Sequence, residues 1–274
     1  MTTTSTTLDW RPYEGDPDAT VVGDLRVSSR FSDPRLAADR ELLVHLPPGY
    51  EDSGKAYPVV YMHDGHNLFD EVASYSGEWE VDETMQALSD EGIDAIVVGI
   101  PNADDDRQLE YTPYAHEEFG GGGADDYLEV LVERIKPMVD EAFRTRDDTA
   151  STGLAGSSLG GLVSLYGFFE YPDTFGFAGV FSPAFWWTEG KIFDYMADQT
   201  RDSGRIYMDV GTAEGDDDED LQEAYVTDAK RMRDVLREQG YDDSQLEFVL
   251  DEGAIHHESA WARRFPNAMR FLLE

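Results

Sequence analysis

Short apolar runs alternate along the chain with longer segments in which apolar residues recur with a helical period. Continuous apolar runs, typical of strands buried in a parallel sheet, occupy residues 58–62, 95–100, 178–181, 206–210 and 246–250. Further strands are predicted at 21–27 and 40–46, and a strand of small residues at 150–155. In the 40–46 segment, Leu42, Val44 and Leu46 alternate with Leu43 and His45, which predicts an outer strand of the sheet.

Apolar residues at three- and four-residue spacing predict helices at 81–88, 125–143, 162–169, 221–238 and from 258 to the C-terminus. Asp125 and Asp126 suit the positive end of the second helix. Pro172 should close the third helix, and Pro266 predicts a break in the last one. Because strands and helices alternate throughout, we expect an α/β fold with a mostly parallel sheet covered on both faces.

The charge of the chain limits its partners and location. Its 274 residues include 58 Asp and Glu against 21 Lys and Arg, which gives a net charge of −37. This argues against nucleic acid or an anionic membrane as a partner. No apolar run approaches the roughly 20 residues of a spanning helix. Residues 1–8 lack the basic and apolar stretches of a signal peptide, so we expect a cytoplasmic location.

Two features of composition add to this picture. The absence of cysteine excludes disulfides and thiolate chemistry. Lysine is scarce, with Lys55, Lys136, Lys191 and Lys230 against 17 arginines. Excess carboxylate with little lysine is typical of proteins that work in molar salt, where the Debye length is about 3 Å. We therefore expect a salt-adapted protein, with ordinary solubility charge as the alternative.

One segment carries most of the chemical information. Residues 156–160, Gly-Ser-Ser-Leu-Gly, fit the G-x-S-x-G pattern with Ser158 at its centre. The pattern follows the small-residue strand and precedes an apolar helix, which is the context of a sharp turn that exposes a nucleophilic hydroxyl. Centring the pattern on Ser157 would place Ala155 and Leu159 where glycines are needed. The alternative is a glycine-rich turn with two surface serines.

A serine nucleophile needs a base and an acid that orients the base, here in the chain order Ser, acid, His. Only His256 and His257 follow Ser158, and both lie just after the 246–250 strand. The acid should follow the 206–210 strand, which favours Glu214 over Asp209 within the strand. The acidic run 216–220 lacks the glycine and glutamate positions of a calcium loop, so we expect a solvated loop there.

The oxyanion hole needs two backbone N–H donors, one of them from the residue after the nucleophile, Leu159. For the second we expect His66, with Asn67 as the neighbouring alternative, because both follow the 58–62 strand beside Gly65. A metal pair at His63 and Asp64 lacks a third ligand of suitable spacing.

Two other segments have less specific interpretations. The glycine run 120–123 is followed by acidic residues and no lysine, so it predicts a flexible loop rather than a phosphate site. Trp186 and Trp187 could line a substrate pocket, with core packing as the alternative, and Asn67 is a further candidate for the pocket.

Together these segments resemble the esterase D or enterochelin-esterase-like branch of the α/β-hydrolases, which also contains feruloyl esterases, acetyl-xylan esterases and mycolyltransferases. The similarity runs from about Arg40 to the C-terminus. It rests on the segments 46–50, 61–70, 98–102, 107–111, 155–161, 182–187, 211–214 and 256–261. Aligned on Glu258 and Trp261, the histidine of the family falls on His256, and His257 replaces an asparagine.

The resemblance implies an N-terminal extension and first strand in residues 1–30 and an α/β-hydrolase catalytic domain in 31–274. It implies a serine carboxylic-ester hydrolase that acts through Ser158, Glu214 and His256 and an acyl-enzyme intermediate, without metal or organic cofactor. The substrate would be a small or medium ester, such as a siderophore, an acyl-sugar or a small thioester. An acyltransferase with the same triad is the alternative, followed by a non-catalytic binding protein. The oligomeric state is left open.

Overall fold

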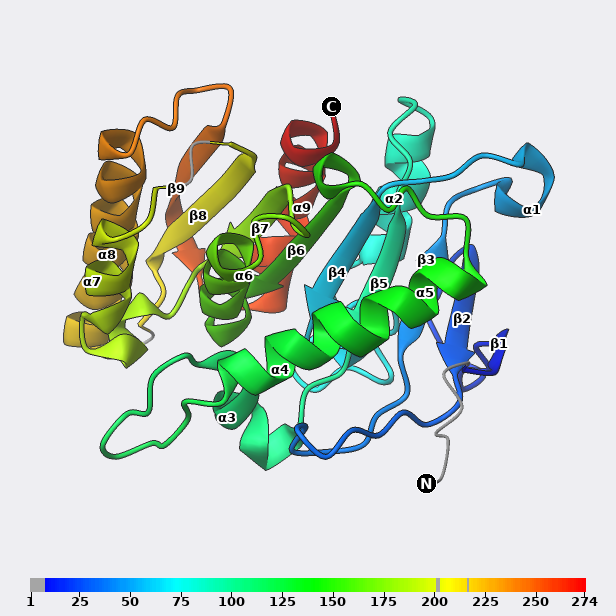
Figure 1. Cartoon of the computed structure of the whole chain (residues 1–274), viewed down its shortest axis with the longest axis horizontal. Helices are drawn as coiled ribbons and strands as arrows, with labels where there is room; N and C mark the ends of the chain where they lie inside the picture. Colours follow the sequence, from blue (N-terminus) through cyan, green and yellow to red (C-terminus); the bar gives the residue numbers. More distant parts are fainter. Residues whose placement is uncertain (1–7, 201–202, 216) are drawn as a thin grey trace.

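The computed structural model describes residues 8–200, 203–215 and 217–274, so the Thr-rich residues 1–7 and Asp216 of the acidic run lie outside it. Nine strands in the described ranges form one sheet in the order β1-β2-β3-β5-β4-β6-β7-β8-β9 (Figure 1). The strands are β1 Trp10–Pro12, β2 Asp24–Ser28, β3 Leu43–Leu46, β4 Val59–His63, β5 Ile96–Ile100, β6 Thr152–Ser157, β7 Phe177–Phe181, β8 Arg205–Ala213 and β9 Leu246–Ile255.

The strands from β5 to β9 in this order are parallel, whereas β1, β2 and β3 are antiparallel at one edge. In the middle of the sheet, Tyr61 of β4 lies between Val98 of β5 and Leu154 of β6. Residues 8–30, the described part of the expected N-terminal extension, supply β1 and β2 to this same sheet.

Helices cover both faces of the sheet, as Figure 1 shows. They are α1 Tyr50–Ser53, α2 Val81–Ser89, α3 Arg107–Tyr111, α4 Ala124–Val130, α5 Lys136–Ala142, α6 Leu159–Glu170, α7 Lys191–Ala197, α8 Glu219–Glu238 and α9 Glu258–Leu273. Short 3-10 helices lie at Gly65–Asn67, Asp104–Asp106, Thr149–Ser151 and Phe185–Thr188, and a π-helical segment, Leu131–Ile135, joins α4 to α5. No helix in the described ranges combines the length and apolar character needed to cross a membrane.

Two separate apolar cores result from this arrangement. One packs α4, α5, α6 and α8 on one face of the sheet, with residues such as Leu128, Leu165 and Met232. The other packs α2 and α9 on the opposite face, with residues such as Met85 and Phe265. The expected α/β class with a mostly parallel sheet covered on both faces is confirmed, and the carboxyl ends of the parallel strands are left free to carry a site.

Two local expectations were wrong. β3 is not an outer strand, because β2 and β1 extend the sheet beyond it. His45 is fully buried there, and burial lowers its pKa to about 4. Pro266 does not break α9 either. The helix continues because Phe265, Met269 and Leu272 on its core face are buried, while Pro266 itself is only half-buried.

Candidate active site

Ser158 occupies the sharp turn between β6 and α6. Its backbone angles are φ 58° and ψ −121°, a strained conformation for a residue with a side chain. Its N–H donates to the carbonyl of Phe181 at 2.9 Å, and its carbonyl accepts from Leu162 and Ala184, both at 3.0 Å. These three bonds hold the turn, so the partly exposed side chain of Ser158 stands at the carboxyl end of the central strands.

Glycines allow this turn to be so tight. A Cβ on Gly156 would lie 2.9 Å from the carbonyl carbon of Gly160, closer than side chains tolerate. A Cβ on Gly160 would lie 3.3 Å from a carboxylate oxygen of Asp64. Ser157, by contrast, is the last residue of β6 and is 5% exposed. Its carbonyl accepts from Arg107 at 3.4 Å.

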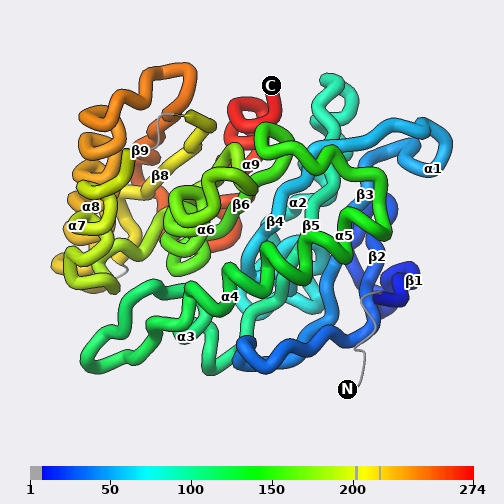
Figure 2. Tube along the Cα trace, in the orientation of Figure 1, coloured from blue at the N-terminus to red at the C-terminus, as the bar shows by residue number. Residues whose placement is uncertain are grey.

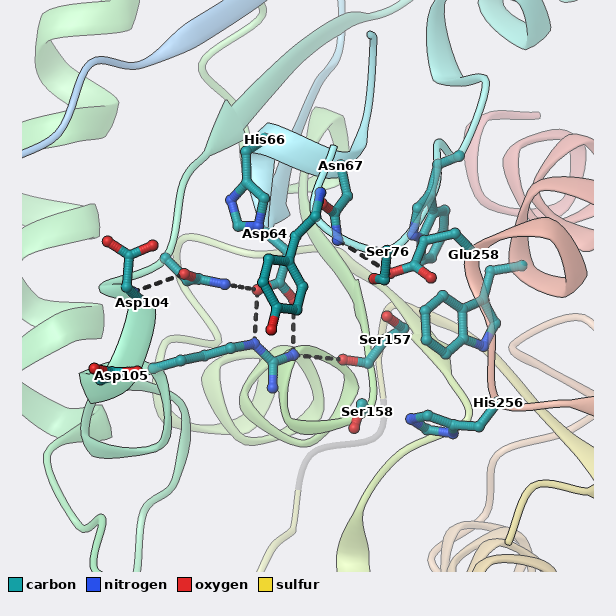
Figure 3. Close-up of a pocket in the computed structure, with 15 residues that line it drawn as sticks. Asp64, His66, Asn67, Ser76, Asp104, Asp105, Ser157, Ser158, His256 and Glu258 are labelled. Carbon is teal, nitrogen blue, oxygen red and sulfur yellow. Dashed lines mark hydrogen bonds and ion pairs between the residues drawn. The ribbon is translucent and has the colours of Figure 1, made fainter. Parts of the chain in front are cut away.

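Glu214 and His256 meet beside this turn. Glu214 directly follows β8, His256 directly follows β9, and Nδ1 of His256 lies 2.5 Å from Oε2 of Glu214. Because the carboxylate can only accept, the imidazole donates its Nδ1 proton and keeps a free lone pair on Nε2. Figure 3 shows Ser158 and His256 facing the same cavity. The structure thus brings together the three residues that the sequence singled out.

Two aromatic rings fix the plane of His256. The Tyr225 ring of α8 lies 4.8 Å away, and the Trp261 ring of α9 lies 5.0 Å away at right angles. Burial raises the pKa of the Tyr225 phenol, while a hydrogen bond with Ser158 opposes that change. Tyr225 therefore contacts both the histidine and the serine.

His257 has a different function. Its Nδ1 accepts the backbone N–H of Ser259 at 3.1 Å, so it caps the first turn of α9. Its side chain lines a separate depression with Glu78 and Arg263. The structure therefore places His257 outside the cavity that contains Ser158.

A buried network holds the second oxygen of Glu214. Oε1 accepts the hydroxyl of Ser182 at 2.6 Å and the N–H of Gly211 at 2.5 Å. The Ser182 oxygen in turn accepts Nε1–H of Trp261 at 2.9 Å and Nη2–H of Arg264 at 3.0 Å. The indole of Trp261 and the guanidinium of Arg264 can only donate, so they use both lone pairs of the Ser182 oxygen. The single proton of the Ser182 hydroxyl must therefore point at Glu214.

Arg264 anchors this network. Its Nε lies 2.9 Å from Oδ2 of Asp209, and its Nη1 lies 3.1 Å from Oδ2 of Asp251. Asp209 is fully buried, and burial raises its pKa to about 7 against the lowering effect of Arg264. Asp209 is therefore engaged by Arg264, whereas Glu214 is the carboxylate that contacts His256.

The structure shows the surroundings of the two backbone N–H groups expected in the oxyanion hole. Leu159 is the first residue of α6, so its N–H has no acceptor within the helix. His66 lies in the 3-10 helix after β4, and it lines the Ser158 cavity. Gly65 permits this approach, because a Cβ there would lie 2.6 Å from the backbone of Gly99. Asn67 also lines the cavity, but its side chain donates to Glu258 at 3.0 Å and accepts from Tyr75 at 2.9 Å.

The segment before His66 is fixed by an ion pair. Arg107 donates to both oxygens of Asp64, at 2.7 and 2.8 Å, and Asn102 adds a bond of 2.6 Å. Burial would raise the pKa of Asp64, but these partners hold it below its ordinary value. His63 is buried beside it with Nδ1 at 2.8 Å from the Tyr127 hydroxyl, and burial lowers its pKa to about 3. Asp64 is thus already neutralised by Arg107.

The cavity in front of Ser158 has a volume of about 370 Å³. Its apolar wall comes from Trp79 and Trp261, whose rings lie 5.5 Å apart. Of the three residues expected in a substrate pocket, Asn67 lines the cavity, whereas Trp186 and Trp187 do not and pack half-buried against the core. The physical reason is that they lie in the 3-10 helix Phe185–Thr188 after β7, which packs against α8.

The glycine run 120–123 ends the long connection from α3 to α4, which projects from the molecule in Figure 2. A bridge between His116 and Gly120 closes this connection on itself. The ring of His116 meets Trp187 at 5.8 Å, so the connection packs against the tryptophan pair.

One group of carboxylates in the described ranges has the spacing of metal ligands. Oxygens of Glu78, Asp82 and Glu83 lie within 4.8 Å of one another, and these residues do not line the Ser158 cavity. Burial raises the pKa of Asp82 to about 8 and that of Glu78 to about 7. Burial therefore favours the protonated forms of Asp82 and Glu78.

Sequence reasoning did not assign Ser182, Arg264 and Tyr225 to the site. Ser182 begins the Ser-Pro segment that contributed only to the family resemblance. Arg264 follows Trp261 by three residues, which places both on one face of α9 and could have indicated a shared role. No sequence signal pointed to Tyr225, because its position depends on how α8 docks on β8.

Comparisons with known proteins identify the family of the chain. A family model described as "Putative esterase" matches residues 34–272. The uncharacterized protein YbbA of Bacillus subtilis is 27% identical over 244 residues, which cover 86% of this chain and 93% of that protein. A siderophore enterobactin esterase of Emericella nidulans is 30% identical over 156 residues, which cover 51% of this chain and 50% of that esterase.

A solved structure shows the same fold. The siderophore hydrolase EstA from Aspergillus nidulans superposes with a TM-score of 0.71 at 17% identity, covering 95% of this chain and 99% of that one. The expected resemblance to the esterase branch of the α/β-hydrolases is therefore confirmed. The chain belongs to this esterase family and is a serine carboxylic-ester hydrolase of the α/β-hydrolase type.

Proposed function

We propose that Ser158, His256 and Glu214 form the catalytic triad of this hydrolase. The observation that carries the proposal is the 2.5 Å contact between Nδ1 of His256 and Oε2 of Glu214, at the mouth of a cavity that also exposes Ser158. The contact fixes the tautomer in which Nε2 is free to accept the Ser158 proton. The rings of Tyr225 and Trp261 keep the imidazole in that plane.

The reaction follows from these positions. Ser158 attacks the ester carbonyl while its proton passes to Nε2 of His256, and Glu214 stabilises the imidazolium. The backbone N–H groups of Leu159 and His66 bind the oxyanion of the tetrahedral intermediate. His256 then protonates the leaving alcohol, and an acyl group remains on Ser158. A water molecule, deprotonated by His256, releases the acid and restores the serine.

The cavity volume of about 370 Å³ suits a small or medium ester. The curated relatives include esterases of siderophores, which makes a siderophore ester one candidate, and an acylated sugar is another.

We further propose a cytoplasmic protein whose acidic surface is adapted to strong salt, on the basis of the net charge of −37.

Two serine variants test the triad. Ser158→Ala should reduce kcat for 4-nitrophenyl acetate by about a thousandfold or more. Ser157→Ala is the matched control, because it removes a neighbouring hydroxyl that lies in the wall of the same cavity. It should retain activity within about threefold of the wild type. Full activity of Ser158→Ala would overturn the proposal. Added acceptor alcohols distinguish hydrolysis, which gives mainly free acid, from acyl transfer.

A further inference from the structure

The walls of the Ser158 cavity carry negative charge. Asp104 and Asp105 stand exposed on one side, and Glu258 lies on the other, with Ser158 between them in Figure 3. Glu258 is 6% exposed and accepts hydrogen bonds from Asn67 at 3.0 Å and Ser76 at 2.6 Å. These bonds hold its carboxylate at the cavity wall without cancelling its charge.

Positive charge does not balance these carboxylates. Among the described residues that line the cavity, Arg107 has the only fixed positive charge, and it donates to both oxygens of Asp64. This ion pair contributes no net charge to the cavity. His256 is oriented by Glu214, whose carboxylate lies behind the ring, near Arg264, and does not line the cavity. An anionic substrate would therefore meet three unbalanced carboxylates and no free counter-ion.

From this we infer that the site selects uncharged or cationic esters and rejects esters that carry negative charge near the scissile bond. The inference rests on the proposed hydrolysis at Ser158 and specifies its substrate class. Three negative charges on the wall of an open cavity disfavour an anion by about tenfold at low salt. Electrostatic focusing in a cleft of one sign acts in the same direction. Iron complexes of catecholate siderophores, which are anionic, would then be poor substrates.

Three aryl acetates that differ in charge provide the test. The probes are 4-acetoxybenzoate, its uncharged methyl ester, and 4-acetoxy-N,N,N-trimethylanilinium. Each kcat/KM is divided by the rate of hydroxide-catalysed hydrolysis of the same compound, which removes differences in leaving-group reactivity. The measurement uses the lowest KCl concentration at which circular dichroism shows native protein. We expect the anion to react about tenfold more slowly than the methyl ester, and the cation at least as fast.

Paired variants locate the effect. In the double variant Asp104→Asn/Asp105→Asn, the ratio of the normalised kcat/KM of the methyl ester to that of the anion should fall by about threefold or more. Asn tolerates the left-handed conformation of Asp104, φ 50°, so the loop should fold normally. The control Asp147→Asn/Asp173→Asn removes the same charge from exposed positions near the opposite ends of β6 and β7 and should leave the ratio unchanged.

Two results would overturn the inference: an anion that reacts as fast as the methyl ester, or a control pair that changes the ratio as much as the cavity pair does. The second result would assign the discrimination to the overall charge of the protein. Hydrolysis of none of the three acetates would instead overturn the proposed function, and the inference with it.

Discussion

Replacing Ser182 by alanine should impair catalysis although this side chain lies behind the triad. The substitution removes the proton that Ser182 donates to Oε1 of Glu214 at 2.6 Å and leaves that oxygen with the Gly211 N–H and the more distant Arg264 guanidinium, whose Nη2 lies 4.0 Å away. A hydrogen bond to a charged group contributes about 1.5–3 kcal/mol. If the transition state depends fully on this bond, kcat/KM falls between about tenfold and about a hundredfold.

The kinetic signature should separate positioning from simple loss of structure. Ser182 does not line the substrate cavity, so KM should stay within about twofold while kcat falls. The Ser182 hydroxyl holds the Glu214 carboxylate in place, so its loss should let the carboxylate turn away from His256 and stabilise the imidazolium less. The acid limb of the kcat/KM profile should then move to lower pH. Trp261 and Arg264 lose an acceptor, which should lower Tm by about 2–4 °C for each kcal/mol lost.

Ser164→Ala is the matched control. Ser164 is also fully buried, and its hydroxyl donates only to the carbonyl of Gly160 one turn earlier in α6, at 2.7 Å. This variant should lower Tm while kcat, KM and the pH profile stay near those of the wild type. The reasoning about Ser182 would be refuted if Ser182→Ala retained wild-type kcat and the same acid limb.

Three further predictions concern the histidines, pH and salt. His256→Ala should reduce kcat/KM by about a thousandfold, whereas His257→Ala should cost about twofold or less in activity and only lower Tm, and equal losses would contradict the assignment. Burial raises the pKa of Asp82 to about 8 from 3.8, so the folded state keeps a proton that the unfolded chain releases. The contribution of Asp82 to stability should therefore be largest below about pH 4 and decline as pH rises toward 8. Asp82→Asn should flatten that decline when Tm is measured between about pH 5 and pH 8. An equal fall of Tm in the wild type and in Asp82→Asn over this range would contradict this explanation. Finally, Tm and activity should rise from about 0.1 M to above about 1 M KCl, because screening relieves the repulsion within a chain of net charge −37. A salt-independent melt would reduce the acidity to a solubility feature.

Local patterns predicted the elements of the fold well, because the buried parallel strands are nearly uniform in apolar character. All residues of β4, β5 and β7 are buried, as their continuous apolar runs indicate. The pattern failed at His45, because the burial of β3 depends on β1 and β2, which a local pattern does not reveal. It failed at Pro266 because packing on the core face outweighs one missing hydrogen bond.

The site was predictable where one short segment carries its own geometry. The turn at Ser158 is encoded by adjacent residues, and the positions of Glu214 and His256 follow from the ends of neighbouring strands. The network behind Glu214 is not encoded locally, since Ser182 and Arg264 are 82 residues apart and meet only when α9 docks beside β7 and β8. Trp186 and Trp187 show the same limit, because aromatic residues fit a pocket or a core equally well until their neighbours are known.

Covalent labelling of the native protein tests the central claim most directly. An organophosphate reacts with a serine only when a neighbouring base activates it, so the labelled position identifies the nucleophile. Digestion and mass spectrometry of the inhibited protein should find the phosphoryl group on Ser158, at one per chain, with complete loss of esterase activity. A label on Ser157 or on another residue, or activity that survives full labelling of Ser158, would contradict the account.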